Sequence, residues 1–163
     1  MGSGKTHWGK IWSAKFGYHF VDLDDTIEKI EGKTIADIFE SKGEAYFRQL
    51  EAAVLRNIEL SQKTIISCGG GSPCFYDNMK WMNENGTTIY LSSTPHQILE
   101  RVLSETEKRP LIKKMNSAEL LFFIEKTLKE RSVFYNAALF SVQAHQLSEN
   151  SFNDILLQLK SSS

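Results

Sequence analysis

The first residues of the chain are of the types that bind phosphate. The run Met1-Gly2-Ser3-Gly4-Lys5-Thr6 matches the second half of the pattern G-x-x-x-x-G-K-[ST], and the first glycine of that pattern would fall before Met1. In such a loop the glycines let backbone N–H groups point at phosphate oxygens, the lysine reaches the outer phosphates, and the threonine hydroxyl coordinates Mg²⁺. A flexible Gly/Ser-rich terminus is the alternative, but apolar residues at helical spacing over 6–16 predict a helix whose N-terminus favours an anion. We therefore predict a phosphate site.

Two carboxylates follow a short β-prone run, residues 18–21. Asp22 and Asp24 are two positions apart at the predicted end of this strand, so one could hold the water shell of a metal ion while the other accepts the proton of an acceptor hydroxyl. An acidic turn or a helix cap is the alternative, and for Asp25 we prefer it. These residues suggest phosphoryl transfer from a bound nucleotide.

Arginines and a glycine-rich turn could bind the acceptor molecule. Arg48 and Arg131 lie on predicted helices, where each alone would be a solvated charge, but together they could bind a carboxylate through bidentate hydrogen bonds. Gly69, Gly70 and Gly71 would present bare backbone to the same ligand. Arg109 lies in the charged segment 104–116, which we predict to be a mobile lid that closes over the phosphates and excludes water.

Strands alternate with helices along the chain, which predicts a parallel sheet covered on both faces. Ligands bind at the carboxyl ends of the strands in such sheets, so the phosphate loop, the two acids and the glycines would meet at one edge. The predicted strands are residues 18–21, 64–68, 87–91 and 139–142, and the predicted helices are 6–16, 26–31, 34–43, 44–61, 76–85, 94–104, 117–131 and 152–159.

The composition is that of one globular domain of 163 residues. The 19 basic and 20 acidic residues give a formal net charge of -1, so we expect no nucleic-acid or membrane partner, and a monomer. No apolar run reaches membrane-spanning length and no signal-peptide core is present, which favours the cytoplasm. Cys68 and Cys74 match neither a zinc pair nor a redox motif, and we predict free thiols.

The ordered set of motifs resembles the shikimate kinases over nearly the whole chain. The resemblance implies an α/β three-layer P-loop NTPase fold like that of the nucleoside-monophosphate kinases, with a parallel five-stranded sheet. It implies transfer of the γ-phosphoryl group of ATP to the 3-hydroxyl of shikimate, with Mg²⁺ as cofactor, in chorismate and aromatic amino acid biosynthesis. The motifs are G-S-G-K-T at 2–6, V-D-L-D at 21–24, F-R-x-x-E at 47–51, G-G-G at 69–71, R-P-L at 109–111, and E-R with a tyrosine at 130, 131 and 135.

The resemblance also implies roles for individual residues. Residues 1–163 would form one kinase domain, with a helical substrate-binding part at about 25–61 and a lid at about 104–116. Lys5, Asp24 and Arg109 would be catalytic. ATP would be bound by Gly2, Ser3, Gly4, Lys5, Thr6, His7 and Arg109, with Arg101 near the adenine; the metal by Thr6 and Asp22; and shikimate by Asp24, Arg48, Gly69, Gly70, Gly71 and Arg131.

The chain departs from the family pattern at its start. Family members carry a β-strand and the first loop glycine ahead of the segment that begins here at Met1, so we expect the first, central strand to be missing. The expected consequence is poorer folding or weaker nucleotide binding. Two other functions are kept as alternatives: a P-loop kinase acting on gluconate or a nucleoside monophosphate, and a non-catalytic nucleotide-binding module.

Overall fold

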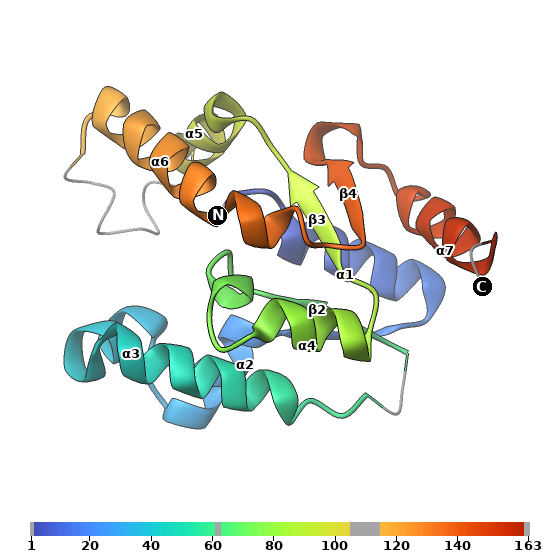
Figure 1. Cartoon of the computed structure of the whole chain (residues 1–163), viewed down its shortest axis with the longest axis horizontal. Coiled ribbons are helices and arrows are strands. Elements are labelled where there is room, and N and C mark those ends of the chain that lie inside the picture. Colours follow the sequence, from blue (N-terminus) through green and yellow to red (C-terminus); the bar gives the residue numbers. More distant parts are fainter. Residues whose placement is uncertain (1, 61–62, 105–114, 162–163) are drawn as a thin grey trace.

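The computed structural model describes residues 2–60, 63–104 and 115–161 (Figure 1). The predicted lid with Arg109 lies almost wholly outside the described residues. None of the described helices is both long and apolar enough to cross a membrane. The helices are α1 (Lys5–Phe16), α2 (Leu23–Glu31), α3 (Ile35–Arg56), α4 (Asn78–Asn85), α5 (Pro95–Ser104), α6 (Ser117–Tyr135) and α7 (Ser151–Ser161), with 3₁₀ turns η1 (Ser72–Cys74) and η4 (Ala144–Gln146).

The four described strands form two separate parallel pairs. β1 (His19–Asp22) pairs with β2 (Thr64–Ser67), and β3 (Ile89–Ser92) pairs with β4 (Phe140–Gln143). The predicted parallel pairing is confirmed. The four strands do not form one continuous sheet, because β2 and β3 are not hydrogen-bonded to each other in the part of the chain that the structure describes. That the five-stranded sheet of the family lacks its first strand here stays a prediction.

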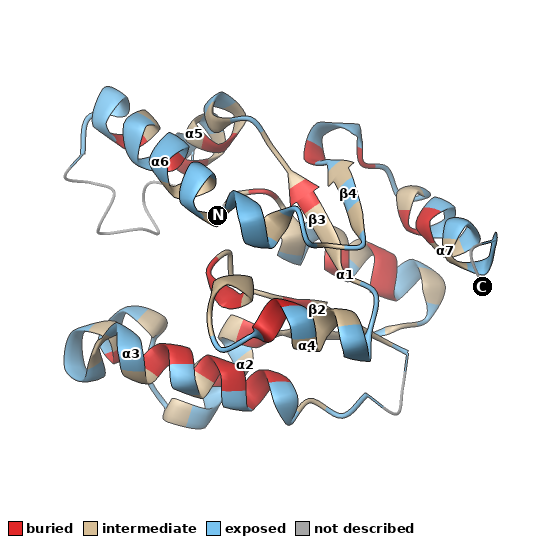
Figure 2. Ribbon diagram, viewed as in Figure 1, coloured by how far each residue is buried: buried red, intermediate tan, exposed pale blue. Residues whose placement is uncertain are grey.

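Buried residues form two larger apolar cores and one smaller cluster (Figure 2). Leu23, Ile27 and Ile38 belong to a core built from α2 and α3, with residues of α4 packed against it. Trp12 of α1 and Phe152 of α7 belong to a second core that includes β3. A smaller cluster joins α5 to α6. Ile65 of β2 packs against the second core, so this core contacts both strand pairs although no ladder connects them.

Capping residues set several helix boundaries. Thr34 and Asp37 form the predicted capping box, and Gly43, with φ 81°, kinks α3 where we predicted one helix to end and the next to begin. The cap of α2 is Asp22, whose carboxylate accepts from the backbone N–H groups of Asp24 and Asp25. Of the two roles given for Asp25, a helix cap or an acidic turn, the cap is wrong, and Asp25 lies in the first turn of α2, which begins three residues earlier than predicted.

Two helix ends differ from the prediction by four or five residues. α3 ends at Arg56, not at residue 61. α6 continues to Tyr135, four residues beyond its predicted end, and its cap is Asn116, whose side-chain oxygen accepts from the backbone N–H groups of Ala118 and Glu119. Both cysteines are free thiols, as predicted.

Two isoleucines of α2 provide a test of the first core. Ile27 is fully buried, whereas Ile30 on the same helix is 60% exposed. We expect Ile27→Ala to lower the free energy of unfolding by about 2–5 kcal/mol, because it leaves a cavity. Ile30→Ala should change it by no more than about 0.5 kcal/mol. Urea unfolding followed by circular dichroism measures both, and similar losses for the two variants would contradict this core.

Candidate active site

The phosphate loop sits at the N-terminus of α1, as the sequence predicted. Gly2 and Gly4 have φ of 61° and 84°, in the left-handed region that glycine adopts without strain. Gly4 is the residue before the first turn of α1, so the backbone N–H groups of that turn are placed for an anion. Arg101 of α5 donates to the carbonyl of Gly2 at 3.0 Å, which ties the loop to α5.

Oxygen atoms suited to a small divalent cation gather beside this loop. The hydroxyl of Thr6 donates to Oδ2 of Asp22 at 2.8 Å and lies 3.3 Å from the hydroxyl of Ser67. No group of three or more His, Cys, Asp or Glu side chains that could hold a metal occurs among the residues that the structure describes. Mg²⁺ fits such a site because it usually keeps several waters and takes one or two protein oxygens together with substrate phosphates.

The carboxyl group of Asp24 has an unusual environment. Its pKa is raised from 3.8 to about 6, chiefly by burial and then by the negative charges of Asp22 and Glu51, while the charge of Lys5 acts in the opposite direction. Oδ1 of Asp24 lies against Gly69, where a Cβ atom would come within 3.2 Å of it. A carboxylate with a pKa near 6 is suited to accept a proton near neutral pH.

Two acidic residues hold the guanidinium of Arg48 next to the glycine turn, residues 69–71. Nη1 donates to Oε2 of Glu51 at 2.9 Å, and Nε and Nη2 donate to Oε1 of Glu44 at 3.2 Å each. A Cβ atom on Gly71 would lie 2.6 Å from Nη2, so this close approach requires glycine. These bonds use three of the five N–H donors of Arg48, which leaves donors for a ligand carboxylate.

Glu51 was not among the predicted site residues, although it belongs to the motif at 47–51. Its side chain is fully buried, and it accepts from the hydroxyl of Ser72 at 2.5 Å as well as from Arg48. The sequence signal is an acid on the apolar stripe of an amphipathic helix, three residues after an arginine. Glu51 and Ser72 therefore connect α3 to the turn that carries the glycines.

α6 reaches the same turn through Tyr135, whose hydroxyl donates to the carbonyl of Gly70 at 2.6 Å. Burial raises the pKa of Tyr135, and Arg131, one turn earlier on the same helix, acts in the opposite direction. Burial raises the pKa of the Cys74 thiol, whereas the charges of both Arg131 and Arg48 lower it, so the two guanidinium groups lie near the same thiol. Tyr135, which also stacks on Tyr90 with ring centroids 4.8 Å apart, was not predicted as a site residue.

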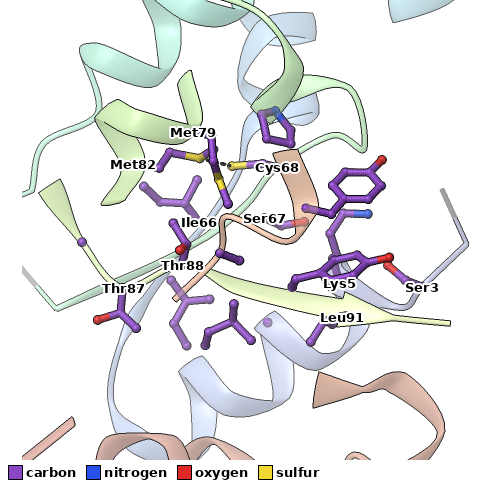
Figure 3. Close-up of a pocket in the computed structure, with 18 of the residues that line it drawn as sticks. Ser3, Lys5, Ile66, Ser67, Cys68, Met79, Met82, Thr87, Thr88 and Leu91 are labelled. Atoms are coloured by element: carbon purple, nitrogen blue, oxygen red, sulfur yellow. Dashed lines mark hydrogen bonds between the residues drawn. The ribbon is translucent and has the colours of Figure 1, made fainter. Parts of the chain in front are cut away.

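The predicted residues thus converge from separate elements. The carboxyl end of β1 brings together the phosphate loop, Asp22 and Asp24, with the glycine turn and Arg48 beside them. Figure 3 shows Lys5 and Ser67 together. His7 lies in the first turn of α1, and its ring and that of Trp8 pack edge to face with their centroids 5.3 Å apart. Arg109 lies outside the described residues. The arrangement brings together the N-terminus of a helix, the carboxyl groups of Asp22 and Asp24, the hydroxyl of Thr6 and the guanidinium of Arg48.

The sequence matches the family model described as shikimate kinase over residues 1–160. This chain belongs to the shikimate kinase family. It is 38% identical over 149 residues to a shikimate kinase of Bacteroides thetaiotaomicron, covering 91% of this chain and 85% of that protein. It is 45% identical over 129 residues to a shikimate kinase of Persephonella marina, covering 79% of this chain and 77% of that protein.

Solved structures of shikimate kinases have the same fold. The crystal structure of the enzyme from Bacteroides thetaiotaomicron gives a TM-score of 0.90 at 36% identity, covering 99% of this chain and 94% of that one. The enzyme from Acinetobacter baumannii, in complex with shikimate, gives a TM-score of 0.82 at 30% identity, covering 99% of this chain and 89% of that one. Shikimate kinases are ATP-dependent kinases that act on shikimate, and the kinase function predicted from the sequence is confirmed.

The raised pKa of Asp24 predicts a pH-dependent effect on stability. Between 3.8 and about 6 the folded state binds more protons at this group than the unfolded state, so the free energy of unfolding falls as the pH rises through that window. In metal-free buffer, Asp24→Asn should therefore melt at a higher temperature than the wild type at about pH 7.5, and the difference should largely disappear at about pH 4.

Calorimetry at both pH values measures this difference. Asp25→Asn is the control, because the side chain of Asp25 is exposed and its variant should show no gain that grows with pH. A wild type that is more stable than Asp24→Asn at the higher pH would contradict the assignment.

Proposed function

We propose that this chain transfers the γ-phosphoryl group of ATP to the 3-hydroxyl of shikimate, giving shikimate 3-phosphate and ADP. The position of Asp24 carries the proposal. Its carboxyl group has a pKa raised to about 6, is influenced by the charge of Lys5, and lies against Gly69 of the glycine turn. The complex of the Acinetobacter baumannii relative with shikimate supports the choice of acceptor.

The phosphate loop would bind the nucleotide. Backbone N–H groups of Gly2, Ser3, Gly4 and His7 would contact phosphate oxygens, and Lys5 would stabilise the charge that develops on the transferred group. Thr6 and Asp22 would hold Mg²⁺, which would neutralise negative charge on the nucleotide phosphates. Arg109, in a lid at about 104–116, would close over the phosphates and exclude water.

Arg48 and Arg131 would bind the carboxylate of shikimate, and the backbone of Gly69, Gly70 and Gly71 would lie against its ring. Asp24 would then accept the proton of the 3-hydroxyl as its oxygen bonds to the γ-phosphorus and the bond from that phosphorus to the ADP oxygen breaks. A base with a pKa near 6 is mostly ionised at neutral pH and still accepts a proton readily.

Residues 1–163 would form a single kinase domain. Its helical part at about 25–61 would bind shikimate. The parallel sheet would be of the nucleoside-monophosphate-kinase type. The protein would act as a monomer in the cytoplasm, where ATP is available, and size-exclusion chromatography with light scattering tests the oligomeric state.

The role of Asp24 is tested by a coupled assay of ADP release with Mg²⁺-ATP, with and without shikimate. We expect shikimate-dependent turnover in the wild type and a loss of about 10²–10⁴-fold in kcat for Asp24→Asn, because general base catalysis contributes about that much. Asp25→Asn should retain the wild-type rate. ATP binding without shikimate-dependent turnover would instead favour a non-catalytic module, and turnover with gluconate alone would favour a different kinase.

The role of Arg48 predicts a selective loss of acceptor binding. Arg48→Lys removes the planar fork of donors, and losing a charge-assisted hydrogen bond worth about 1.5–3 kcal/mol should raise KM for shikimate about 10- to 100-fold. KM for ATP should stay within about twofold of the wild type, since no residue of the phosphate loop changes. An equal rise in both KM values, measured by varying each substrate in the same assay, would count against this role.

A further inference from the structure

Asn78, at the first position of α4, has a fully buried polar side chain. Its Nδ2 donates to the carbonyl of Ser72 at 2.8 Å, and its Oδ1 accepts from Nη1 of Arg56 at 2.7 Å. An asparagine near the start of a helix commonly accepts from the first N–H groups of that helix, as Asn116 does for α6. The side chain of Asn78 instead connects two other elements, the turn η1 and the end of α3.

The two neighbours of this amide have opposite and fixed polarity. The backbone carbonyl of Ser72 only accepts hydrogen bonds, and the guanidinium of Arg56 only donates them. A side chain between them must therefore donate in one direction and accept in the other. The amide of asparagine does both, whereas the carboxylate of aspartate, which has nearly the same shape, only accepts. Position 78 thus calls for an amide.

Ser72 joins this amide to the acceptor side of the site. It is fully buried, its hydroxyl donates to Oε1 of Glu51 at 2.5 Å, and its backbone N–H donates to the carbonyl of Gly69 at 3.1 Å. Glu51 in turn accepts from Nη1 of Arg48 at 2.9 Å. A continuous series of hydrogen bonds therefore runs from Asn78 to the guanidinium of Arg48.

The chain bends just before Asn78, and Arg56 holds the bend. Tyr76 and Asp77 have φ of 50° and 54°, in the left-handed region that is uncommon for residues other than glycine. Strained backbone of this kind persists where the surrounding contacts fix it. Arg56 donates from Nη2 to the carbonyl of Tyr76 at 2.7 Å and from Nη1 to the carbonyl of Ala52 at 2.9 Å. Arg56 therefore ties the bend, and with it the direction of the Asn78 side chain, to α3.

We propose that Asn78 is a positioning residue, which holds the guanidinium of Arg48 in place for the acceptor by fixing Ser72. The inference rests on the proposed function, in which Arg48 binds the carboxylate of shikimate. α3 contacts the turn from two sides, because Glu51 binds the hydroxyl of Ser72 and Arg56 orients the amide that binds its carbonyl. A movement of the turn that released Arg48 would have to break hydrogen bonds on both sides.

Asn78→Asp removes one donor and keeps the shape of the side chain. The carboxylate still accepts from Arg56 but cannot donate to the carbonyl of Ser72. We expect KM for shikimate to rise about tenfold, and the dissociation constant of shikimate, measured by calorimetry without nucleotide, to rise by a similar factor. In the assay of ADP release, kcat should change by less than about threefold and KM for ATP by less than about twofold, because the phosphate loop and Asp24 are unchanged.

Asn83 provides a matched control on the same helix. Its Nδ2 also donates to a backbone carbonyl, that of Ala137 at 2.9 Å, and its Oδ1 accepts from the hydroxyl of Thr88. Asn83→Asp makes the same chemical change away from the glycine turn, so KM for shikimate should stay within about twofold of the wild type even if the melting temperature falls. An equal rise in KM for the two variants would indicate a general loss of packing and would overturn the proposal.

Two further variants test the series of hydrogen bonds, and the first of them does so even if Asn78→Asp folds poorly. Arg56→Ala, at an exposed position, frees the amide to turn and should raise KM for shikimate about threefold. Asn78→Asp added to Arg48→Lys should raise KM by less than a further twofold or so, because residues in one network do not act additively. Full additivity, or an unchanged KM for shikimate in both Asn78→Asp and Arg56→Ala, would overturn the proposal.

The wild type separates this inference from the proposed function. If the wild type binds and phosphorylates shikimate while Asn78→Asp does so equally well, the positioning role alone is overturned. If the wild type neither binds shikimate nor turns it over, the proposed function fails, and the positioning role fails with it.

Discussion

The acceptor side of the site depends on the burial of one carboxylate. Glu51 is fully removed from solvent, and a charge in that position is costly unless it is paired and hydrogen-bonded. Arg48 on the same helix and Ser72 on the turn after β2 supply those partners. The helix and the turn must therefore dock together before the carboxylate is satisfied, and that docking places the Arg48 guanidinium against Gly71.

The same charge also acts on the base. The negative charge of Glu51 is one of the causes that raise the pKa of Asp24, after burial and the charge of Asp22. One buried group thus positions the guanidinium of Arg48 and raises the proton affinity of a neighbouring acid. Buried ion pairs often add little to stability, and here the pair is better understood as a device that fixes geometry.

Short sequence patterns were sufficient to predict the local features. The rule that ligands bind at the carboxyl ends of parallel strands predicted that these features meet at one edge of the sheet. The capping box at Thr34, the glycines of the phosphate loop and the acids at the end of β1 follow from short patterns with a clear physical cause. The α/β fold class and the parallel pairing also followed, because strands alternate with helices. Asp22 rather than Asp25 caps α2, since the backbone turns into the helix directly after β1, and boundary positions are seldom fixed by pattern alone.

Non-local features could not be predicted in this way. Which strands pair with each other depends on contacts between segments distant in sequence, which no window of residues encodes. The same holds for the bond from Tyr135 to the carbonyl of Gly70, which spans 65 positions and brings α6 to the glycine turn. An acid beside an arginine on a helix usually indicates a solvent-exposed ion pair, so the sequence pattern did not predict Glu51 as a site residue.

The contact between Gly71 and Arg48 also has a consequence for drug resistance. Every missense change at a glycine codon adds a Cβ atom, and at this position that atom would lie 2.6 Å from a nitrogen held by Glu44. The guanidinium would have to leave its acidic partners to make room, and with them the geometry of the acceptor pocket. An inhibitor that rests on the backbone of this turn would therefore contact a surface that point mutation could not alter without moving the guanidinium of Arg48.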